Sequence, residues 1–202
     1  MTSKLEDSYS NLYENHLVSV ATRLEDLVSN YFENEPRIDR ISARPKTVGS
    51  FIEKANKIES DEKVYSDPLN QIQDQIGVRV ITFYKSDVDR VCDVVNRYFR
   101  AIEDKLLVPE SESEFGYFGR HFVLFLPSDV FENNDQRDEC PDFFELQVKT
   151  LYQHAWSEAN HDLGYKSDSP LNPDQKRKIA FTAAQSWGAD LVFSELFDEM
   201  HS

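Results

Sequence analysis

The stretch from Asp142 to Lys166, DFFELQVKTLYQHAWSEANHDLGYK, changes its hydrophobic period part-way along. Its first half alternates as a strand does, and the apolar face carries Phe144, Leu146 and Val148. The opposite face carries Glu145, Gln147 and Lys149. The second half has helical spacing from about Leu151 to Leu163 and is predicted to stop at Gly164. Since neither Glu145 nor Gln147 can enter an apolar core unpaired, the polar face of this strand must line a partner or a cleft.

The remaining chain alternates between the two periods without regular strand–helix–strand units. We predict helices at Leu12–Phe32, Val48–Ile58 with Thr47 as its cap, 86–99 with a capping box from Ser86 and Asp89, and 173–200. We predict strands at Arg37–Ala43, 77–83, His121–Pro127 and Phe143–Lys149, and a mobile polar loop at Val130–Asp142. This pattern predicts an α+β fold with a mixed sheet flanked by helices, including long ones at about 10–33 and 173–200. No linker divides the chain, so we expect one domain over residues 1–202.

The 202 residues carry a formal net charge of −15, and 40% of them are hydrophobic. Such a charge repels a polyanion, which makes nucleic acid an unlikely partner, but a local basic cluster can still hold a small phosphate ligand. No apolar run is long enough to span a membrane, and the N-terminus has no signal-peptide pattern. With only Cys92 and Cys140, no disulfide framework is indicated. We therefore expect a cytoplasmic protein that does not associate with membranes.

A basic cluster surrounds the predicted helix start in ARPKTVGSFIEK. Arg44 and Lys46 precede the helix, Ser50 lies in its first turn, and Lys54 follows one turn later. The free N–H groups and partial positive charge of a helix N-terminus suit an anion. Basic side chains at that end cost the helix about 0.3–1 kcal/mol each. This local conflict favours a phosphate ligand, although a solvated basic face would show the same spacing.

Two further segments combine charged or aromatic residues with a predicted strand. Asp74 precedes a buried strand and Arg79 lies within it, so the pair forms either an ion pair or part of a site. In EFGYFGRHF, glycines on both sides of Tyr117 would suit a loop that stacks an aromatic ring on a base, with His121 following. A turn that buries the tyrosine would use the same residues.

The predicted helix from about Leu151 to Leu163 carries His154, Glu158 and His161 at positions i, i+4 and i+7. A zinc site is one reading of these residues, but three ligands over two turns match no recognised zinc signature. The polar wall of a nucleotide pocket, or a solvated face, agrees better with the spacing.

Taken together, these segments resemble the synthetase domain of the RelA/SpoT family, the alarmone synthetases. The resemblance runs in order from about Arg37 to Lys166, through ARPKTVGSFIEK, IQDQIGVRVITFY with SDVDRV, GYFGRHFVLFLP and FELQVKTLYQHAWSEANHDLGYK. It implies a nucleotidyltransferase-like fold of the compact small alarmone synthetase kind. It also implies transfer of pyrophosphate from ATP to the 3′-hydroxyl of GDP or GTP, giving ppGpp or pppGpp. Since this chain has no room for the metal-dependent hydrolase domain of the long members, we expect synthesis without degradation.

The resemblance also implies roles for individual residues. Asp74 would hold a catalytic Mg²⁺, with Mn²⁺ as an alternative, and Glu145 would share the metal or take the proton of the acceptor hydroxyl. Arg44 and Arg79 would sandwich the adenine of ATP. The ATP phosphates would be held by Lys46, Ser50 and Lys54. Tyr117 would stack on the acceptor base, and the acceptor would be positioned by His121, Gln147 and His154.

This sequence departs from the family pattern on the acceptor side. Phe118 and Gly119 stand where many members have arginine and serine, and the acidic ESESEFGY stands where a lysine is common. An adenine nucleotide or the tRNA 3′ end is therefore an alternative acceptor, and a non-catalytic nucleotide sensor is an alternative function. A polynucleotide nucleotidyltransferase would need paired carboxylates such as Asp87 and Asp89, but these open a predicted helix.

The long terminal helices raise the question of self-association. Their apolar faces carry Leu17, Leu24 and Val28 at one end of the chain and Phe193, Leu196 and Phe197 at the other. These faces could be buried within one subunit or between subunits. Because related small synthetases often self-associate, we predict a homo-oligomer, either a dimer or a tetramer.

Overall fold

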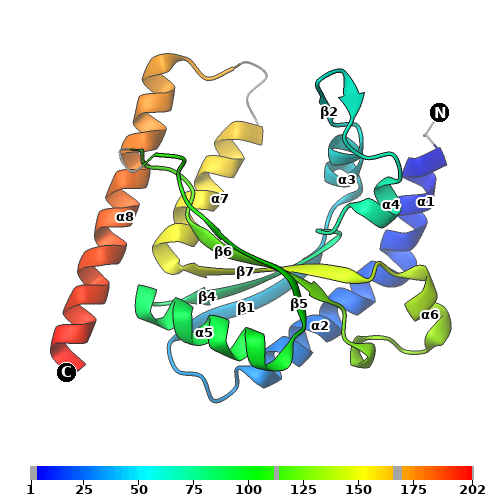
Figure 1. The fold of residues 1–202 in the computed structure, drawn as a ribbon, viewed down its shortest axis with the longest axis horizontal. Helices are drawn as coiled ribbons and strands as arrows, with labels where there is room; N and C mark the ends of the chain where they lie inside the picture. Colours follow the sequence, from blue (N-terminus) through cyan, green and yellow to red (C-terminus); the bar gives the residue numbers. More distant parts are fainter. Residues whose placement is uncertain (1–3, 112–113, 166–169, 202) are drawn as a thin grey trace.

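The computed structural model describes residues 4–111, 114–165 and 170–201. Its centre is a five-stranded sheet in the order β1-β4-β7-β6-β5 (Figure 1). The strands are β1 (Ile38–Pro45), β4 (Ile76–Thr82), β7 (Phe143–Thr150), β6 (Gly119–Phe125) and β5 (Ala101–Leu107). Only β4 and β7 run parallel to each other, and the other neighbours are antiparallel. The predicted α+β fold with a mixed sheet is thus confirmed.

One face of the sheet is covered by α2 (Val18–Tyr31) and α5 (Lys85–Tyr98), which lie below it in Figure 1. The strand residues on this face are apolar and buried, among them Val78, Val80, Phe144, Leu146 and Val148. They pack against the apolar stripes of the two helices, which include Leu24, Val28, Val91 and Val95. The alternation of apolar and polar residues in β7 therefore places its apolar side chains in the core and its polar side chains on the opposite face of the sheet.

The N-terminal helix begins earlier than predicted. α1 (Lys4–Leu12) continues through a π-helical segment, η1 (Tyr13–Leu17), into α2. Tyr9 anchors the extension, because its buried ring stacks on Phe51 at a centroid distance of 3.7 Å and its hydroxyl donates to the Lys46 carbonyl at 2.8 Å. Leu17, Leu24 and Val28 are all buried within the subunit. This apolar face is therefore part of the core and is not available to a second copy.

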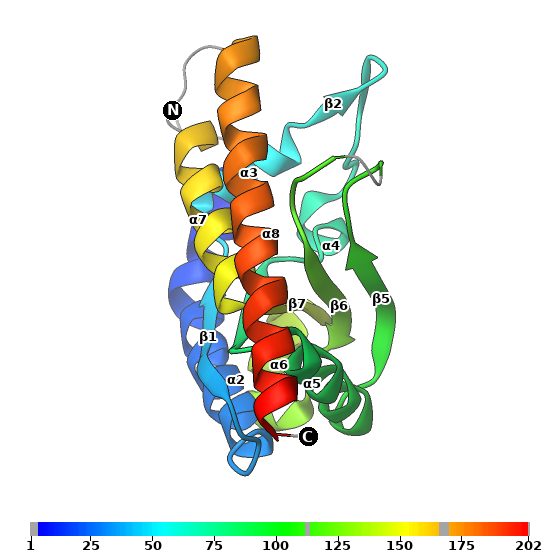
Figure 2. The ribbon, with the colours of Figure 1, turned by 90° about the vertical axis from the view of Figure 1, so that its left-hand side faces the viewer.

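Two groups of elements stand on the other face of the sheet and diverge in Figure 1. On one side lie α3 (Val48–Ala55), the hairpin of β2 (Ile58–Glu59) and β3 (Glu62–Lys63), and α4 (Pro68–Gln71). On the other side lie α7 (Leu151–Tyr165) and α8 (Pro173–His201), which run side by side (Figure 2). Hydrogen bonds from Ser186 to the Tyr152 carbonyl and from Trp156 to Thr182 join the two helices.

Several boundaries differ from the sequence predictions. The strand β5 was not predicted, because its run AIEDKLL is charged and mostly exposed at the edge of the sheet. The segment Val130–Asp142 is not a structureless loop, since it contains α6 (Asn134–Glu139) after the short 3₁₀ turn η2 (Ser128–Val130). Asn133 caps α6 and the helix buries Gln136, so a polar sequence is held by side-chain hydrogen bonds. Helix α7 runs one residue past Gly164 to Tyr165, and Lys166 lies outside the described residues.

The start of α5 corrects a further prediction. The helix begins at Lys85, and Asp87, rather than the predicted Ser86 and Asp89 pair, accepts a hydrogen bond from the Tyr84 amide at 3.2 Å. The Asp87 carboxylate is fully buried and pairs with Arg37 and Arg90, each at 2.8 Å. Asp89 is exposed. Asp87 is thus a structural anchor, so the two aspartates do not form a carboxylate pair for a metal.

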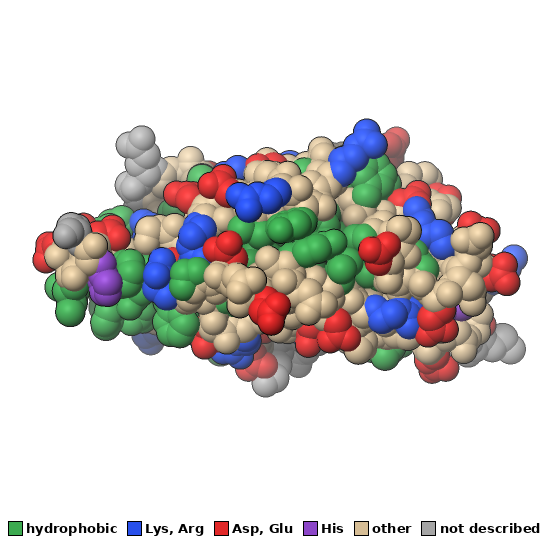
Figure 3. All heavy atoms as spheres, turned by 90° about the horizontal axis from the view of Figure 1, so that it is seen from below, with side chains coloured by type: hydrophobic (Ala, Val, Ile, Leu, Met, Phe, Trp, Pro, Cys, Tyr) green, Lys and Arg blue, Asp and Glu red, His purple; other side chains and the backbone are tan. Residues whose placement is uncertain are grey.

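The outer face of α8 remains largely uncovered in the subunit. Its exposed hydrophobic side chains are Phe181, Val192, Phe193, Leu196 and Met200. Figure 3 shows hydrophobic side chains gathered at the end of the molecule that carries the C-terminal end of α8. Two rings of α8 do make contacts within the subunit: Phe193 stacks on Tyr152, and Phe197 stacks on Tyr84 and lies under the Arg37 guanidinium. Within the described residues, none of the helices has the length and apolarity needed to cross a membrane.

Candidate active site

A row of polar side chains crosses four strands on the face of the sheet that α2 and α5 leave open. The parallel register places Gly77 opposite Glu145 and Arg79 opposite Gln147. The antiparallel neighbours extend the row, with Ser42 opposite Arg79 and His121 opposite Gln147. Because side chains on one face repeat every second residue, the register alone brings these groups together from distant parts of the chain.

A cleft of about 470 Å³ lies over this row, between the α3 side and the α7 side of the fold (Figure 1). We call it the sheet cleft. It is lined by Ser42, Arg44, Pro45, Lys46, Thr47, Ser50, Asp74, Gly77, Val78, Arg79, Glu145, Gln147 and His161. The predicted site residues that do not line it are Lys54, Tyr117, His121 and His154. Lys54, Tyr117 and His121 are nevertheless linked to the cleft wall by contacts described below.

Asp74 lies on the α3 side of the sheet cleft, beside two lysines. Its Oδ2 atom is 3.0 Å from the ammonium of Lys46 and 3.0 Å from that of Lys54. Its Oδ1 atom is buried and has no hydrogen-bond partner among the described residues. Burial, the largest influence, raises the pKa of Asp74, but the two lysines together outweigh it and the net pKa is lowered. The group is an ionised carboxylate with one oxygen free to bind a cation.

The backbone around Lys46 is fixed by elements from three parts of the chain. The Lys46 amide donates to the Gln75 carbonyl at 2.8 Å, and its carbonyl accepts from Tyr9. Thr47 then caps α3 as predicted, accepting from the Ser50 amide at 3.3 Å. The N-terminus of α3 therefore faces the same cleft as Asp74, and its partial positive charge adds to that of Lys46 and Arg44. An acidic chain thus presents a locally basic surface.

Glu145 is held by a chain of hydrogen bonds that reaches Tyr117. Its Oε1 is 2.8 Å from Nδ1 of His121, and its Oε2 accepts from Gln147 at 2.7 Å. The Tyr117 hydroxyl is 2.6 Å from Nε2 of His121. Because an ionised carboxylate can only accept, Nδ1–H of His121 donates to Glu145. Burial is the largest influence and raises the pKa of Glu145, but His121 and Gln147 outweigh it, so the net pKa is lowered.

Gly119 permits the close approach that this chain of hydrogen bonds requires. A Cβ atom at this position would lie 2.9 Å from the Tyr117 hydroxyl. The tyrosine ring therefore folds back over the glycine to reach His121. At Gly119, the departure from the family pattern leaves room for the Tyr117 ring. Phe118, the other departure, lines a different pocket from the sheet cleft. Of the acidic stretch before Tyr117, residues 112–113 lie outside the described residues.

Lys149 belongs to this site although the sequence analysis assigned it no role. Its ammonium is almost fully buried, 3.2 Å from the Ser157 hydroxyl and 4.7 Å from the centroid of the Tyr117 ring. Burial, and then the charge of Arg79, lower its pKa to about 8. The signal that could have identified it was its place on the same strand face as Glu145 and Gln147.

The helix α7 contributes an ion pair rather than a zinc site. Glu158 pairs with Arg79 at 2.8 Å, so Arg79 does not form the alternative ion pair with Asp74. Nδ1 of His154 is buried without a partner among the described residues, and burial lowers the pKa of this histidine. Across residues 4–111, 114–165 and 170–201, no group of three or more His, Cys, Asp or Glu side chains is placed to hold a metal ion. His161, which was not predicted as a binding residue, lines the sheet cleft.

The family model for the region found in RelA / SpoT proteins matches residues 43–170, which contain every candidate site residue. The chain belongs to the RelA/SpoT family. It is 24% identical over 175 residues to the GTP pyrophosphokinase YjbM of Bacillus subtilis, covering 84% of this chain and 77% of the relative.

Solved structures of family members share the fold. A GTP pyrophosphokinase family protein from Streptococcus pneumoniae superposes with a TM-score of 0.73 at 19% identity, covering 99% of this chain and 96% of the other. Small alarmone synthetase 1 from Bacillus subtilis, bound to its product pppGpp, gives 0.71 at 20% identity, covering 99% and 100%. At these identities the likeness establishes the fold, and the resemblance proposed from the sequence is confirmed.

The buried Lys149 makes a prediction about pH. With its folded pKa near 8 and its usual value near 10.5, the protonated form is disfavoured in the folded state. The wild-type protein should therefore gain stability as the pH rises through 8. Lys149→Met should be more stable than wild type at pH 7, by at most about 3 kcal/mol, with a smaller difference at pH 9.5. Urea unfolding at both pH values measures this difference.

The matched control is Lys63→Met, which replaces an exposed lysine in the β2–β3 hairpin. Its effect on stability should be small and independent of pH. A Lys149→Met protein that is less stable than wild type at pH 7 would contradict the prediction, since it would show that the contacts of the ammonium exceed the cost of burying it.

Proposed function

We propose that this protein is an alarmone synthetase that transfers pyrophosphate from ATP to the 3′-hydroxyl of GDP or GTP, forming ppGpp or pppGpp. The observation that carries the proposal is the free, buried Oδ1 of Asp74, placed beside two lysines and a helix N-terminus in the same cleft as Glu145. Family membership and the similarity to a protein named GTP pyrophosphokinase support it. Residues 1–202 would act as one synthetase domain.

The α3 side of the sheet cleft is suited to the ATP donor. Arg44 and Arg79 supply planar cations that can stack on adenine as lysine cannot. Lys46, Ser50 and Lys54 lie around the N-terminus of α3, where they would hold the phosphates. Before ATP binds, Lys46 and Lys54 neutralise Asp74, and the phosphates would draw both ammoniums away from it. This exchange would free the second oxygen of the carboxylate at the moment when substrate arrives.

Asp74 and Glu145 fit a divalent cation with a preference for oxygen ligands. Mg²⁺ is typically bound through one or two carboxylates together with substrate phosphates and water. The unpartnered Oδ1 of Asp74 would hold it, and Glu145 would contribute a second oxygen; Mn²⁺ would serve in the same place. When bound, the ion would neutralise charge on the transferring phosphoryl groups.

The acceptor would lie on the α7 side, against the chain of hydrogen bonds that ends at Tyr117. Glu145 is ionised at neutral pH and would accept the proton of the 3′-hydroxyl. His121 orients this carboxylate, and Gln147 holds its other oxygen. One face of the Tyr117 ring is approached by Lys149, so the base would stack on the other face. Buried and without a partner, Nδ1 of His154 would bind the acceptor.

The first prediction concerns product formation. Purified protein would be incubated with Mg²⁺, ATP and each acceptor in turn: GMP, GDP, GTP, ADP, ATP and deacylated tRNA. We expect 3′-pyrophosphorylated guanine nucleotides as the main products, separated by anion-exchange chromatography. Asp74→Asn and Glu145→Gln should each lower the rate at least 100-fold, because each removes a charge at the reacting groups. Asp89→Asn, an exposed change on α5, should leave the rate unchanged.

The other outcomes of this experiment assign the alternatives. Products only from ADP, ATP or tRNA would show that the segment around Phe118 and Gly119 selects a different acceptor. No product from any acceptor, with nucleotide binding retained, would favour a non-catalytic nucleotide sensor. Full activity in either carboxylate variant would refute the assignment of the catalytic residues.

The second prediction separates the two halves of the cleft. Arg44→Ala should raise the KM for ATP about tenfold or more and leave the KM for the acceptor within twofold. Tyr117→Ala should do the opposite, since it removes the surface for the acceptor base. Initial rates measured with one substrate saturating give both constants. Equal effects of both variants on both substrates would contradict the division into donor and acceptor sides.

A homo-oligomer also remains part of the proposal. Since Leu17, Leu24 and Val28 are buried within the subunit, the face available for contact is that of α8, with Phe193 half exposed at 50% and Leu196 at 46%. Size-exclusion chromatography with light scattering should show a dimer or tetramer, and Phe193→Asp should shift it towards the monomer. A wild-type protein that elutes only as a monomer would refute this part of the proposal.

A further inference from the structure

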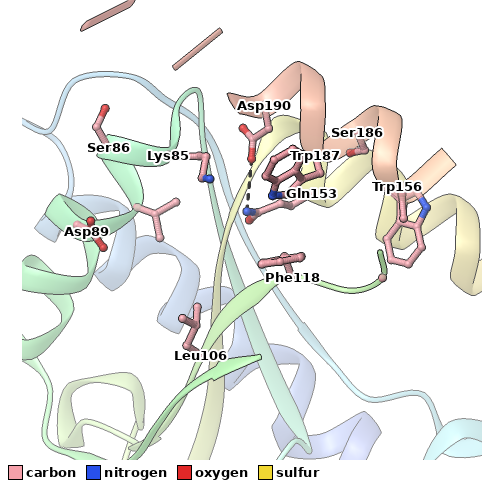
Figure 4. A pocket seen from close by; sticks show the side chains of 13 residues that line it. Lys85, Ser86, Asp89, Leu106, Phe118, Gln153, Trp156, Ser186, Trp187 and Asp190 are labelled. Carbon is pink, nitrogen blue, oxygen red and sulfur yellow. Dashed lines mark hydrogen bonds between the residues drawn. The ribbon is translucent and has the colours of Figure 1, made fainter. Parts of the chain in front are cut away.

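A second cavity, of about 370 Å³, lies on the opposite side of α7 from the sheet cleft and shares no lining residue with it (Figure 4). We call it the α8 pocket. Its walls come from α8, α7, the first turns of α5 and the segment before β6. The side chains that matter below are Lys85, Phe118, Gln153, Trp187 and Asp190. Its volume is within the range of small-molecule sites.

Asp190 is the buried carboxylate of this pocket, and a hydrogen bond with the Thr150 side chain and the charge of Lys85 only partly offset its burial. It is only 3% exposed. Its Oδ2 accepts a long hydrogen bond of 3.4 Å from Gln153, as drawn in Figure 4, and its Oδ1 has no hydrogen-bond partner within the described part of the chain. A buried carboxylate oxygen without a donor costs free energy and calls for an explanation. Burial raises the pKa of Asp190 to about 6, so at neutral pH the group is mostly ionised and can only accept.

Aromatic side chains form part of the apolar wall of the pocket, beside Val88, Leu106 and Ala183. Trp187 and Phe118 lie on opposite sides of the cavity in Figure 4, and Trp156 closes one end. The three aromatic side chains keep some exposed surface: Trp187 is 40% exposed, and Phe118 and Trp156 are partly buried. The Lys85 ammonium lies 5.9 Å from the centroid of the Trp187 ring and adds a positive charge to the pocket wall. Two facing aromatic surfaces suit a flat ring between them.

We propose that the α8 pocket binds a flat aromatic heterocycle that presents adjacent N–H donors. The ring would lie between Trp187 and Phe118, and the donors would satisfy Oδ1 of Asp190. A purely apolar ligand would leave the carboxylate oxygen unpaired. An amino-substituted neutral heterocycle meets both the aromatic walls and the buried acceptor.

The position of the α8 pocket links it to the acceptor side of the sheet cleft. Phe118 follows Tyr117 directly, and Tyr117 is joined through His121 to Glu145. On α7, Gln153 precedes His154. A ligand that fixes Phe118 and Gln153 would therefore change how readily Tyr117 and His154 bind the acceptor, and the acceptor would change the affinity for the ligand by the same factor. The α8 pocket is thus an effector site; this coupling, unlike the binding itself, rests on the proposed synthetase function.

The test of binding uses the full chain and 2-amino-4(3H)-quinazolinone as the probe, measured by isothermal titration, because this compound is neutral at pH 7 and presents adjacent ring N–H and amino donors. Its matched control is 2-methyl-4(3H)-quinazolinone, which is also neutral, has the same shape and lacks the amino donor. We expect the control to bind at least tenfold more weakly. Asp190→Asn should weaken binding of the probe at least tenfold, and Phe118→Ala provides a second, independent variant with the same expected direction. Asp93→Asn, an exposed change on α5 outside the pocket, should leave the affinity unchanged.

The fold of Asp190→Asn is checked by thermal unfolding, and its melting temperature should not fall below that of wild type, because the variant no longer buries a charge. No binding of the probe to wild type would overturn the proposal. So would equal binding of the two compounds, or binding that neither variant weakens. Displacement of the probe by a saturating non-hydrolysable ATP analogue together with GDP would place it in the sheet cleft and would also overturn the proposal.

The coupling has its own readout. In the synthetase assay the probe should change the KM for the acceptor at least twofold and leave the KM for ATP unchanged, and Asp190→Asn should abolish this effect. Binding without any change in KM would limit the α8 pocket to a ligand site and refute its role as an effector site. If no acceptor yields product, the proposed function fails while the binding measurement still decides the site.

Discussion

The parallel pairing of β4 with β7 is the constraint on which the rest of the site depends. Sixty residues separate these strands in the chain, yet their register places Gly77 beside Glu145 and Arg79 beside Gln147. A slip of one residue would turn Glu145 into the core and Leu146 into the cleft. The buried faces of both strands prevent this, because Val78, Val80, Leu146 and Val148 have no exposed surface to lose. Packing on one face of the sheet thus fixes the chemistry on the other.

The protein gathers positively charged side chains around this row of residues, although its net charge is negative. A chain with a net charge of −15 places Arg44, Lys46, Lys54 and Arg79 around a single cleft. The lysines neutralise Asp74, and Arg79 is held by Glu158, so the cleft carries few unpaired charges in the absence of substrate. Lys149 and Asp190 are different, because each is buried with little compensation and its pKa is displaced towards neutrality. A buried ionisable group with few compensating contacts lowers the stability of the fold. Groups with displaced pKa values gather at functional sites, so these two residues point to binding sites.

Local periodicity predicted most of the fold and failed where polar or exposed segments are structured by distant contacts. The amphipathic patterns of α2, α5 and α8, and the apolar alternation of β7, gave these elements correctly. The strand β5 was missed because an edge strand needs no apolar face, and it is held by pairing with β6. The helix α6 was missed because its hydrogen bonds to Arg23 on α2 lie more than a hundred residues away. The start of α5 was misplaced because Asp87 is fixed by Arg37 as well as by its own helix.

By itself, the sequence determined the class of the fold, the residue types of the site and the membership of a family, since these depend on period and on motif order. Tertiary structure decided how the site residues are paired. It joined Lys46 and Lys54 to Asp74, gave Arg79 to Glu158, and linked Tyr117 through His121 to Glu145. It also placed the Lys149 ammonium against the Tyr117 ring and left one oxygen of Asp190, in a separate pocket, without a donor among the described residues. Pairing depends on strand register and helix placement, and burial depends on the whole fold, so neither can be read from local spacing.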